Sequence, residues 1–505
     1  MNEKKCPIME KCGGCQYLGI PYEEQLRQKQ QKLQKLLGNM VTLEPIIGME
    51  NPYYYRNKVT ATFGRTKDGT VYAGIYEEKS HRLLKRSGCF LENELAGQII
   101  DELTKMVKSF KWTVYNEKSG YGLIRHAMIR TARQTGEVMV ILVTTSNILP
   151  GARNFARALK SRFPEITTIV QNVNDRQTTM VLGQRDIVLY GKGYIEDILC
   201  GCRFRLSPQS FYQINPVQTE LLYRKALEYA GLEPIRNAPA DSSSHPGDPS
   251  DSPAVRNHDG KRAVRVLDTY CGIGTIGICA AKYAGNVIGA ELNREAVKDA
   301  KRNAERNGLT NIRFVNADAT QFMTQMAEEK EPVDVLFMDP PRSGSTEEFL
   351  RAAIRLSPER IVYVSCGPDT LARDLKFVLR NSCYVVKRAV GVDMFPGTSH
   401  VETVVLLSQL RQKPDDYIEV DVDVAELEGT SAETKATYEK IKKYVAEHND
   451  GMKVSSLYIA QVKSKCGLEL AENFNLPKSE DARQPRCPKE KEEAIMKALK
   501  SFKMI

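Results

Sequence analysis

Apolar and polar side chains alternate along the first half of the chain, with the two-residue period of a half-buried strand. Such segments occupy residues 58–63, 71–76, 124–133 and 138–144. Thr66-Lys67-Asp68-Gly69 lies between the first two and predicts a hairpin turn. Apolar residues at helical spacing predict helices over residues 22–37, 91–110 and 152–161, the first ending at Gly38. Residues 39–205 therefore predict an α+β domain built on an antiparallel sheet.

Short apolar runs alternate with helical segments in the second half of the chain. After a helix predicted over residues 217–231, strands are predicted over residues 264–268, 287–290, 312–316, 333–338, 360–365, 384–389 and 401–408. This βαβ rhythm is typical of a doubly wound parallel sheet with helices on both faces. The predicted fold class is α/β, with an N-terminal α+β domain over residues 1–205 and a catalytic domain over residues 206–410.

Two segments break this pattern. Residues 235–262 are rich in Pro, Ser, Asp and Asn without apolar periodicity, which predicts an exposed, disordered insert. Lys413-Pro414-Asp415-Asp416 breaks the chain, and residues 411–505 form a predicted helical accessory domain with helices over 432–448, 455–466 and 489–502. Two short helices around a turn resemble a helix-turn-helix, but a small helical packing module has the same pattern.

Composition narrows the function classes. The 505 residues are 42% hydrophobic and 27% charged, as in a globular chain of several domains. No apolar run approaches the roughly 18–20 residues that cross a bilayer, and the N-terminus lacks a secretory signal. We expect a cytoplasmic monomer without membrane contact or an obligate protein partner. The net charge of +9 is compatible with a polyanionic partner and equally with a lysine-rich soluble enzyme.

A glycine-rich turn indicates a cofactor site. Asp268-Thr269-Tyr270-Cys271-Gly272-Ile273-Gly274-Thr275 follows an apolar strand and opens a helix, and its glycines let the backbone approach a ligand. Glu291 ends the next strand, where a carboxylate can accept both ribose hydroxyls, and Asp318 follows the third strand, where it suits an adenine amino group. The turn alone also occurs in NAD enzymes. Together with Asp339-Pro340-Pro341, the strand ends favour S-adenosylmethionine.

Cys366 is the candidate nucleophile, in Val364-Ser365-Cys366-Gly367-Pro368 at the end of a predicted strand. Asp339-Pro340-Pro341-Arg342 is a stiff loop that suits a pocket for a flat base, although enzymes that methylate amino groups share this motif and need no cysteine. A thiolate that adds to C6 of uracil activates C5 for methylation. A base must then remove the C5 proton, and Glu402 is favoured over His400. The alternative for Cys366 is a buried structural residue.

The N-terminal cysteines suggest a metal site, because disulfides are rare in cytoplasmic chains. Cys6-x5-Cys12-x2-Cys15 has thiolates at a spacing that suits zinc and an iron–sulfur cluster equally. Cys200-Gly201-Cys202 is too tight for a common zinc knuckle and is interpreted as structural.

These motifs resemble the RNA uracil-C5 methyltransferase family, which includes bacterial 23S rRNA and tRNA (uracil-5-)-methyltransferases, over about residues 6–408. The resemblance implies a Rossmann-like S-adenosylmethionine-dependent methyltransferase domain with Cys366 as nucleophile and Glu402 as base. It also implies that residues 1–205 form an iron–sulfur and RNA-recognition domain. It implies cofactor contacts by Gln213, Tyr270, Thr275, Glu291, Asp318 and Asp339. Ribosomal RNA members carry a [4Fe-4S] cluster on three close cysteines and a distant one, which implies the ligands Cys6, Cys12, Cys15 and Cys89.

The chain departs from the family pattern in three places. Many members begin with a small β-barrel RNA-binding domain that this sequence lacks, and the insert 235–262 and the tail 411–505 lie outside the common core. The target nucleotide therefore stays open. The main hypothesis is methylation of a uridine in 23S rRNA. The alternatives are a tRNA T-loop methyltransferase, a non-catalytic iron–sulfur RNA-binding protein, which the intact Cys366 argues against, and a DNA-modifying enzyme.

Overall fold

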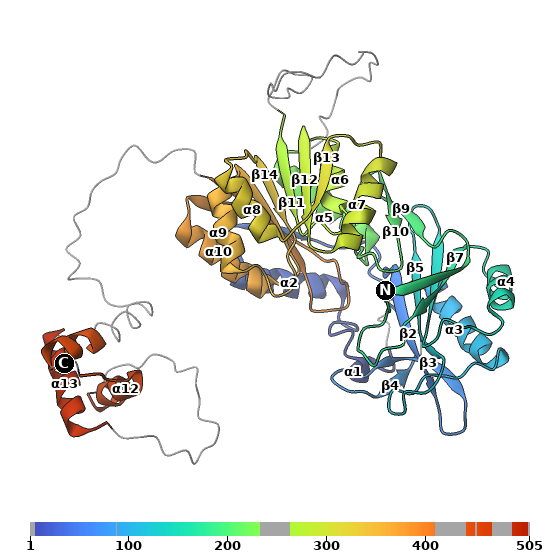
Figure 1. Cartoon of the computed structure of the whole chain (residues 1–505), viewed down its shortest axis with the longest axis horizontal. Coiled ribbons are helices and arrows are strands. Elements are labelled where there is room, and N and C mark those ends of the chain that lie inside the picture. The colour runs from blue at the N-terminus through green and yellow to red at the C-terminus, as the bar shows by residue number, and fades with distance from the viewer. Residues whose placement is uncertain are drawn as a thin grey trace. The chain divides into compact units, whose positions relative to one another are not determined.

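The fold was analysed in a computed structural model, which describes residues 6–86, 88–232, 263–409, 441–449, 452–466 and 487–502. The chain divides into two compact units, Met1–Lys413 and Pro414–Ile505 (Figure 1). The disordered insert predicted at residues 235–262 lies outside the described residues.

A sheet of eight strands forms the larger part of the first unit. Its parallel centre consists of β11 (Arg265–Thr269), β12 (Asn286–Glu291), β13 (Ile312–Asn316), β14 (Val335–Met338) and β15 (Arg360–Ser365). One edge consists of β1 (Leu43–Ile47), β16 (Tyr384–Val392) and β17 (Glu402–Gln409), in the overall order β1-β16-β17-β15-β14-β11-β12-β13. The predicted parallel sheet is confirmed, and β17 runs antiparallel to β15.

Successive residues of a strand point to opposite faces of the sheet, and in these strands both faces are apolar. Helices therefore cover both faces. Val266 packs into one core with α5 (Pro216–Ala230), α6 (Thr275–Ala281) and α7 (Arg294–Arg306). Leu267 packs into the other core with α2 (Tyr22–Leu37), α8 (Ala319–Glu328), α9 (Glu347–Leu356) and α10 (Pro368–Asn381). In such a sheet, ligands bind at the carboxyl ends of the parallel strands.

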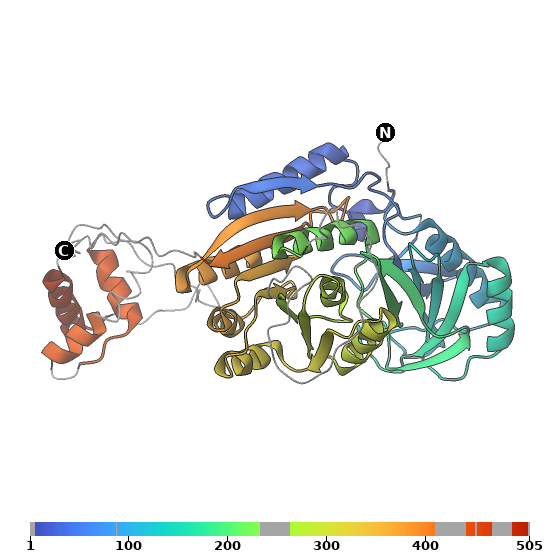
Figure 2. The ribbon, with the colours of Figure 1, turned by 90° about the horizontal axis from the view of Figure 1, so that it is seen from above.

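The segment of α2 and β1 joins this sheet from the N-terminal part of the chain. β1 pairs in parallel with β16, and Figure 2 shows the blue helix and strand beside the orange strands. Lys29 of α2 donates a 2.6 Å hydrogen bond to the Asp393 carboxylate, and both side chains are fully buried. The sequence analysis placed this segment in domain 1–205, whereas the structure packs it on the eight-stranded sheet. Long-range pairing decides this placement, and no local pattern reports it.

A second sheet of seven strands follows β1 in the chain. In spatial order it consists of β4 (Leu83–Lys85), β3 (Val71–Tyr76), β2 (Lys58–Arg65), β5 (Ile124–Thr131), β6 (Val138–Thr144), β7 (Ile166–Val173) and β8 (Arg185–Tyr190). The helices α3 (Glu94–Ser109) and α4 (Ala152–Arg162) share one core with the sheet. Neighbouring strands are antiparallel, as predicted, except that β6 and β7 pair in parallel. The sequence analysis missed β7 and β8.

Short elements complete the first unit. α1 (Met9–Cys12) lies near the N-terminus, and β9 (Ile195–Leu199) pairs with β10 (Cys202–Leu206). Cys202 is fully buried, and its thiol contacts the backbone carbonyl of Ile278 in α6 over 3.8 Å. This environment agrees with the structural interpretation of the Cys200-Gly201-Cys202 motif.

The second unit is helical where the structure describes it. It contains α12 (Ser456–Lys465) and α13 (Lys489–Ser501), besides helical residues 441–448. Ile441, Val445, Ile459, Ile495 and Leu499 are fully buried together. The accessory role of this unit and the division at residues 205 and 410 stay predictions. Among the described residues, no helix is both long and apolar enough to cross a membrane.

Candidate active site

A cavity of about 460 Å³ lies at the carboxyl ends of the parallel strands. Its wall includes the turn after β11, the end of β12, the loop after β14, Cys366 after β15 and Glu402 at the start of β17. Most of the residues singled out from the sequence meet here: Gln213, Tyr270, Thr275, Glu291, Asp339, Cys366 and Glu402. Phe211, on the segment before Gln213, is 65% exposed and lines the same cavity.

The turn after β11 is shaped by left-handed backbone. Gly272 has φ +55° and Gly274 has φ +83°, a conformation that side chains disfavour. A Cβ on Gly274 would lie 2.6 Å from the ring of Phe314, so the close packing of the turn also requires glycine. A Cβ on Gly272 would meet nothing within 4 Å, which leaves this backbone open to a ligand.

Two carboxylates fasten this turn. The backbone N–H of Gly277 donates to Asp268 over 2.8 Å, and that of Gly272 donates to Glu291 over 3.1 Å. Asp268 is buried, and burial raises its pKa to about 8. The second Glu291 oxygen accepts from the backbone N–H of Asn293 over 2.7 Å, and the side chain lines the cavity, where the sequence analysis expected it to meet a ribose.

Cys366 and Glu402 are neighbours across the sheet. β15 and β17 pair antiparallel with Ser365 opposite Thr403, so the next residue of each strand end faces the same edge. Burial, and then the charges of Glu402 and Asp339, raise the pKa of the Cys366 thiol to about 11, while Arg342 opposes this shift. Burial and the Asp339 charge raise the pKa of Glu402, which is 3% exposed, to about 8.

The site therefore combines the thiol of Cys366 with two acids, Glu402 and Asp339, whose pKa values lie near neutral pH. Burial raises the pKa of Asp339 to about 7. A carboxyl group tuned in this way is suited to accept and release protons near neutral pH. The adjoining Pro340 and Pro341 fix the loop that carries Asp339 into the cavity.

Comparisons with known proteins fit this geometry. The model of the tRNA (uracil-5-)-methyltransferase family matches residues 254–410. An RNA methyltransferase of Clostridium tetani is 39% identical over 415 residues, 81% of this chain and 84% of the relative. One from Halalkalibacterium halodurans is 37% identical over 410 residues, 80% and 83% of the two chains. The chain belongs to the RNA uracil-C5 methyltransferase family.

A solved structure of the same kind aligns with most of this methyltransferase. The Pyrococcus abyssi tRNA (uracil-54, C5)-methyltransferase, in complex with S-adenosyl-L-homocysteine, is 28% identical with a TM-score of 0.62. The match covers 80% of this chain and 87% of that one. The present chain is thus an S-adenosylmethionine-dependent RNA methyltransferase, and the expected enzyme class is confirmed.

Two residues considered from the sequence lie outside the cavity wall of this methyltransferase. The Asp318 carboxylate accepts hydrogen bonds from the backbone N–H groups of Thr320 and Gln321 and so caps α8, which leaves its expected adenine contact a prediction. His400 packs edge-on to Phe395 and is absent from the cavity lining of the described residues. The choice of Glu402 over His400 as the base stays a prediction.

The sequence analysis missed other residues that shape the site. Tyr223 of α5 shares a 2.8 Å hydrogen bond with the hydroxyl of Thr275 and also lines the cavity. Arg342, quoted only as the end of the Asp-Pro-Pro motif, lies close enough to oppose the pKa shift of Cys366. A tyrosine inside an amphipathic helix carries no signal of such a role, whereas the position of Arg342 after a strand-end motif does.

The N-terminal cysteines lie around one small cavity of their own. Cys6, Cys12, Cys15 and Cys89 line it together with apolar side chains that include Ile8, Met9 and Leu18. Burial, and then the neighbouring Cys89, raise the pKa of the Cys15 thiol to about 12. In the part of the chain that the structure describes, no three His, Cys, Asp or Glu side chains are arranged to hold one metal ion.

Proposed function

We propose that this enzyme methylates C5 of a uridine in 23S rRNA through a covalent bond between Cys366 and C6 of the base. The observation that carries the proposal is the placement of Cys366 and Glu402 side by side, in the cavity that also contains the glycine turn. A methyltransferase acting on an amino group would need neither residue.

The Cys366 thiol must ionise before it reacts. Its proton leaves to solvent, and the Arg342 guanidinium stabilises the resulting thiolate. The thiolate adds to C6, and the electrons of the C5–C6 double bond move toward the C4 carbonyl, giving an enolate that is nucleophilic at C5. S-Adenosylmethionine, when bound, supplies the methyl group that C5 accepts, and S-adenosylhomocysteine is the leaving group.

The Glu402 carboxylate completes the reaction. It removes the proton left on C5, the C5–C6 double bond reforms, and the Cys366 thiolate is expelled. A pKa of about 8 makes this carboxylate a better proton acceptor than an ordinary glutamate. The carboxylate returns the proton to solvent after release of the RNA.

Binding of the methyl donor is assigned to the turn and the strand ends around it. The backbone at Gly272 is open to the ligand, and the Glu291 carboxylate would accept the ribose hydroxyls. Gln213, Tyr270, Thr275 and Asp339 complete the proposed set around the cavity. Tyr270 is steadied by stacking on Phe349, with ring centroids 5.1 Å apart.

We further propose that Cys6, Cys12, Cys15 and Cys89 hold a [4Fe-4S] cluster. Four thiolates around one apolar cavity repel each other unless a cationic group lies among them, and the raised pKa of Cys15 reflects this environment. Three close cysteines and a distant fourth match the pattern of the ribosomal RNA members of the family, which favours the cluster over zinc. The cluster would brace the N-terminal segment, since methyl transfer needs no electron carrier.

The choice between rRNA and tRNA rests on different observations. The cysteine pattern favours the ribosomal branch, while the family description and the Pyrococcus abyssi enzyme name tRNA. The test is nucleoside mass spectrometry of unmodified 23S rRNA and tRNA transcripts, each incubated with the enzyme and S-adenosylmethionine beside a Cys366→Ala control. 5-Methyluridine in rRNA alone supports the proposal, and product in tRNA alone moves the enzyme to the tRNA branch. Product in neither RNA contradicts the proposed function.

A further inference from the structure

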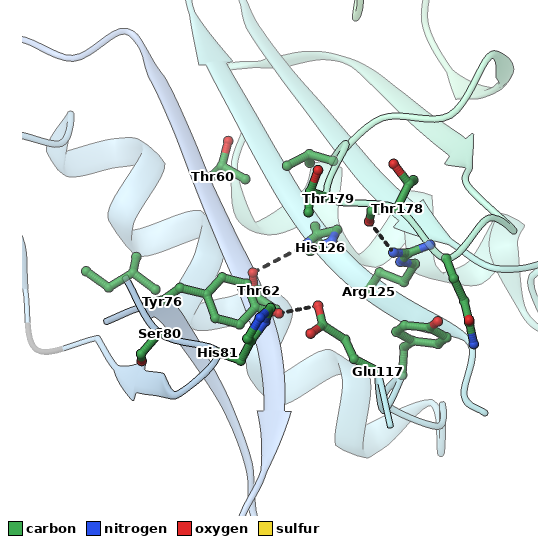
Figure 3. Close-up of a pocket in the computed structure, with 15 residues that line it drawn as sticks. Thr60, Thr62, Tyr76, Ser80, His81, Glu117, Arg125, His126, Thr178 and Thr179 are labelled. Atoms are coloured by element: carbon green, nitrogen blue, oxygen red, sulfur yellow. Dashed lines mark hydrogen bonds between the residues drawn. The ribbon is translucent and has the colours of Figure 1, made fainter. Parts of the chain in front are cut away.

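A second cavity, of about 610 Å³, lies on the sheet of the N-terminal part (Figure 3). On β2, Val59, Ala61 and Phe63 pack into the core with α3, so the alternate residues Thr60 and Thr62 face the other way and line the cavity. Tyr76 from β3 and His126 from β5 complete this face of the sheet. The volume is that of a site for a small organic group.

The far wall of the cavity is held in place by Arg125. The pairing of β5 with β6 shifts between Ile124 and His126, a bulge that redirects the side chain at position 125. The Arg125 guanidinium, 3% exposed, donates to the backbone carbonyls of Asn174 and Arg176 over 2.8 and 2.7 Å. This anchors the loop that contributes Gln177, Thr178 and Thr179 to the cavity wall.

Two charged groups line the cavity, and both are hydrogen-bonded within the protein: Arg125 to backbone carbonyls and Glu117 to the Tyr76 hydroxyl. The other side chains named above are flat or neutral. Burial lowers the pKa of His126 to about 4, so the ring is neutral, and its Nδ1 lies 3.0 Å from the Thr62 hydroxyl. The Tyr76 hydroxyl donates to the Glu117 carboxylate over 2.6 Å, which leaves the tyrosine ring at the cavity wall. Aromatic faces beside neutral donors and acceptors suit a nucleobase better than a phosphate.

Strand β2 connects this cavity with the active site. Asn57, just before β2, donates through its side chain to the Gln213 carbonyl over 3.1 Å, and Gln213 lines the catalytic cavity. Thr60 follows three residues later, about 10 Å along the strand. This distance corresponds to the length of about three stacked nucleotides. Lys58 lies on the same face between them, and burial beside Arg130 lowers its pKa to about 8. A phosphate anion beside Lys58 would stabilise its charged form and offset the repulsion from Arg130.

We propose that this cavity receives one unstacked nucleotide of the same RNA, a few residues from the uridine that enters the active site. The proposal rests on the proposed function, because it needs an RNA substrate. It gives the enzyme a second contact with a base, in addition to the target uridine. Sequence preference around the target would then come partly from Thr60, Thr62, Tyr76 and His126.

The test compares full-length variants on the RNA that the wild type methylates. Tyr76→Ala removes the ring, Thr179→Trp fills the cavity from an exposed position, and Tyr76→Phe keeps the ring. Tyr190→Ala is the matched control, since Tyr190 is 39% exposed on the same sheet and Tyr76 is 36% exposed. We expect the first two to raise KM for RNA about 5- to 100-fold with kcat and KM for S-adenosylmethionine unchanged. Tyr76→Phe and Tyr190→Ala should match the wild type.

A filter-binding measurement with the 23S rRNA transcript separates this proposal from the methylation itself. Weaker binding by Tyr76→Ala and Thr179→Trp supports the cavity as a nucleotide site even if the wild type forms no 5-methyluridine. Affinities within twofold of the wild type for both variants would overturn it. In a methylated fragment, an abasic residue at one flanking position should weaken binding to the wild type and have no further effect on Tyr76→Ala.

Discussion

Replacement of Glu402 by glutamine should separate formation of the covalent adduct from its release. The amide has nearly the shape of the buried carboxyl group but cannot take the C5 proton. A positioned base contributes typically about 10²–10⁴-fold, so steady-state turnover should fall by about that factor. The methylated RNA should then remain attached to Cys366.

The steps before release should be spared in this variant. The Cys366 thiol has a pKa of about 11, so at pH 8 roughly one thiol in a thousand is ionised. After burial, the Glu402 charge is the largest cause that raises this pKa. Its removal lowers the pKa, and each unit gives about tenfold more thiolate. Addition to C6 should therefore proceed at least as fast as in the wild type.

Rapid-quench single turnover with radiolabelled S-adenosylmethionine, followed by denaturing gel electrophoresis, measures both quantities. We expect Glu402→Gln to methylate its bound RNA once, within about tenfold of the wild-type rate, and to accumulate a protein–RNA complex. Glu295→Gln, at a 71% exposed side chain of α7, should turn over normally. If Glu402→Gln lowers the single-turnover rate of methyl transfer as much as it lowers the steady-state rate, the assignment of Glu402 to adduct release is refuted.

Three further predictions concern stability and the cysteine site. Because the folded pKa of Glu402 is about 8, above its ordinary 4.5, the folded state holds an extra proton between these values. The melting temperature should therefore fall as pH rises from 4.5 to 8, and this pH dependence should be weaker in Glu402→Gln. Parallel curves of melting temperature against pH for the two proteins would contradict the prediction. Lys29→Met leaves the buried Asp393 with the Tyr22 hydroxyl but without its cationic partner, and the free energy of unfolding in denaturant should fall by about 3–5 kcal/mol. An unchanged free energy of unfolding would show that the ion pair is dispensable. Cys12→Ser should lower iron and acid-labile sulfide in anaerobically purified protein, unlike Cys383→Ser at an exposed cysteine; equal contents would exclude the cluster ligand.

Local sequence patterns predicted where helices and strands begin and end better than they predicted which elements pack together. The helix at residues 22–37 and the strands at 312–316 and 360–365 have the predicted bounds, because each has one clear periodicity. The placement of α2 and β1 on the eight-stranded sheet depends on the pairing of Leu43 with Ala389, two residues too far apart in the sequence for any local pattern to connect. β8 was missed because most of its side chains are exposed and its pattern resembles a loop.

The convergence of the candidate site residues on one cavity was predictable because strand ends converge in a doubly wound sheet. Cys366 and Glu402 end up together because β17 reverses beside β15, an arrangement that the position of each residue at a strand end anticipates. Asp318 has the same kind of position, yet its carboxylate caps α8, since a strand end is also a helix start. The second cavity was missed because Thr60 and Thr62 have the pattern of an ordinary solvent-facing side of a strand.

The covalent bond to Cys366 is the central claim, and RNA containing 5-fluorouridine tests it most directly. A base can abstract a proton from C5 but cannot abstract fluorine, so the covalent adduct remains after methyl transfer. The wild-type enzyme would be incubated with this RNA and S-adenosylmethionine, digested with trypsin and nuclease, and analysed by mass spectrometry. The account predicts a methylated fluorouridylate on the peptide that contains Cys366, absent from Cys366→Ala. An adduct on another cysteine, or none in a preparation that methylates ordinary RNA, would contradict it.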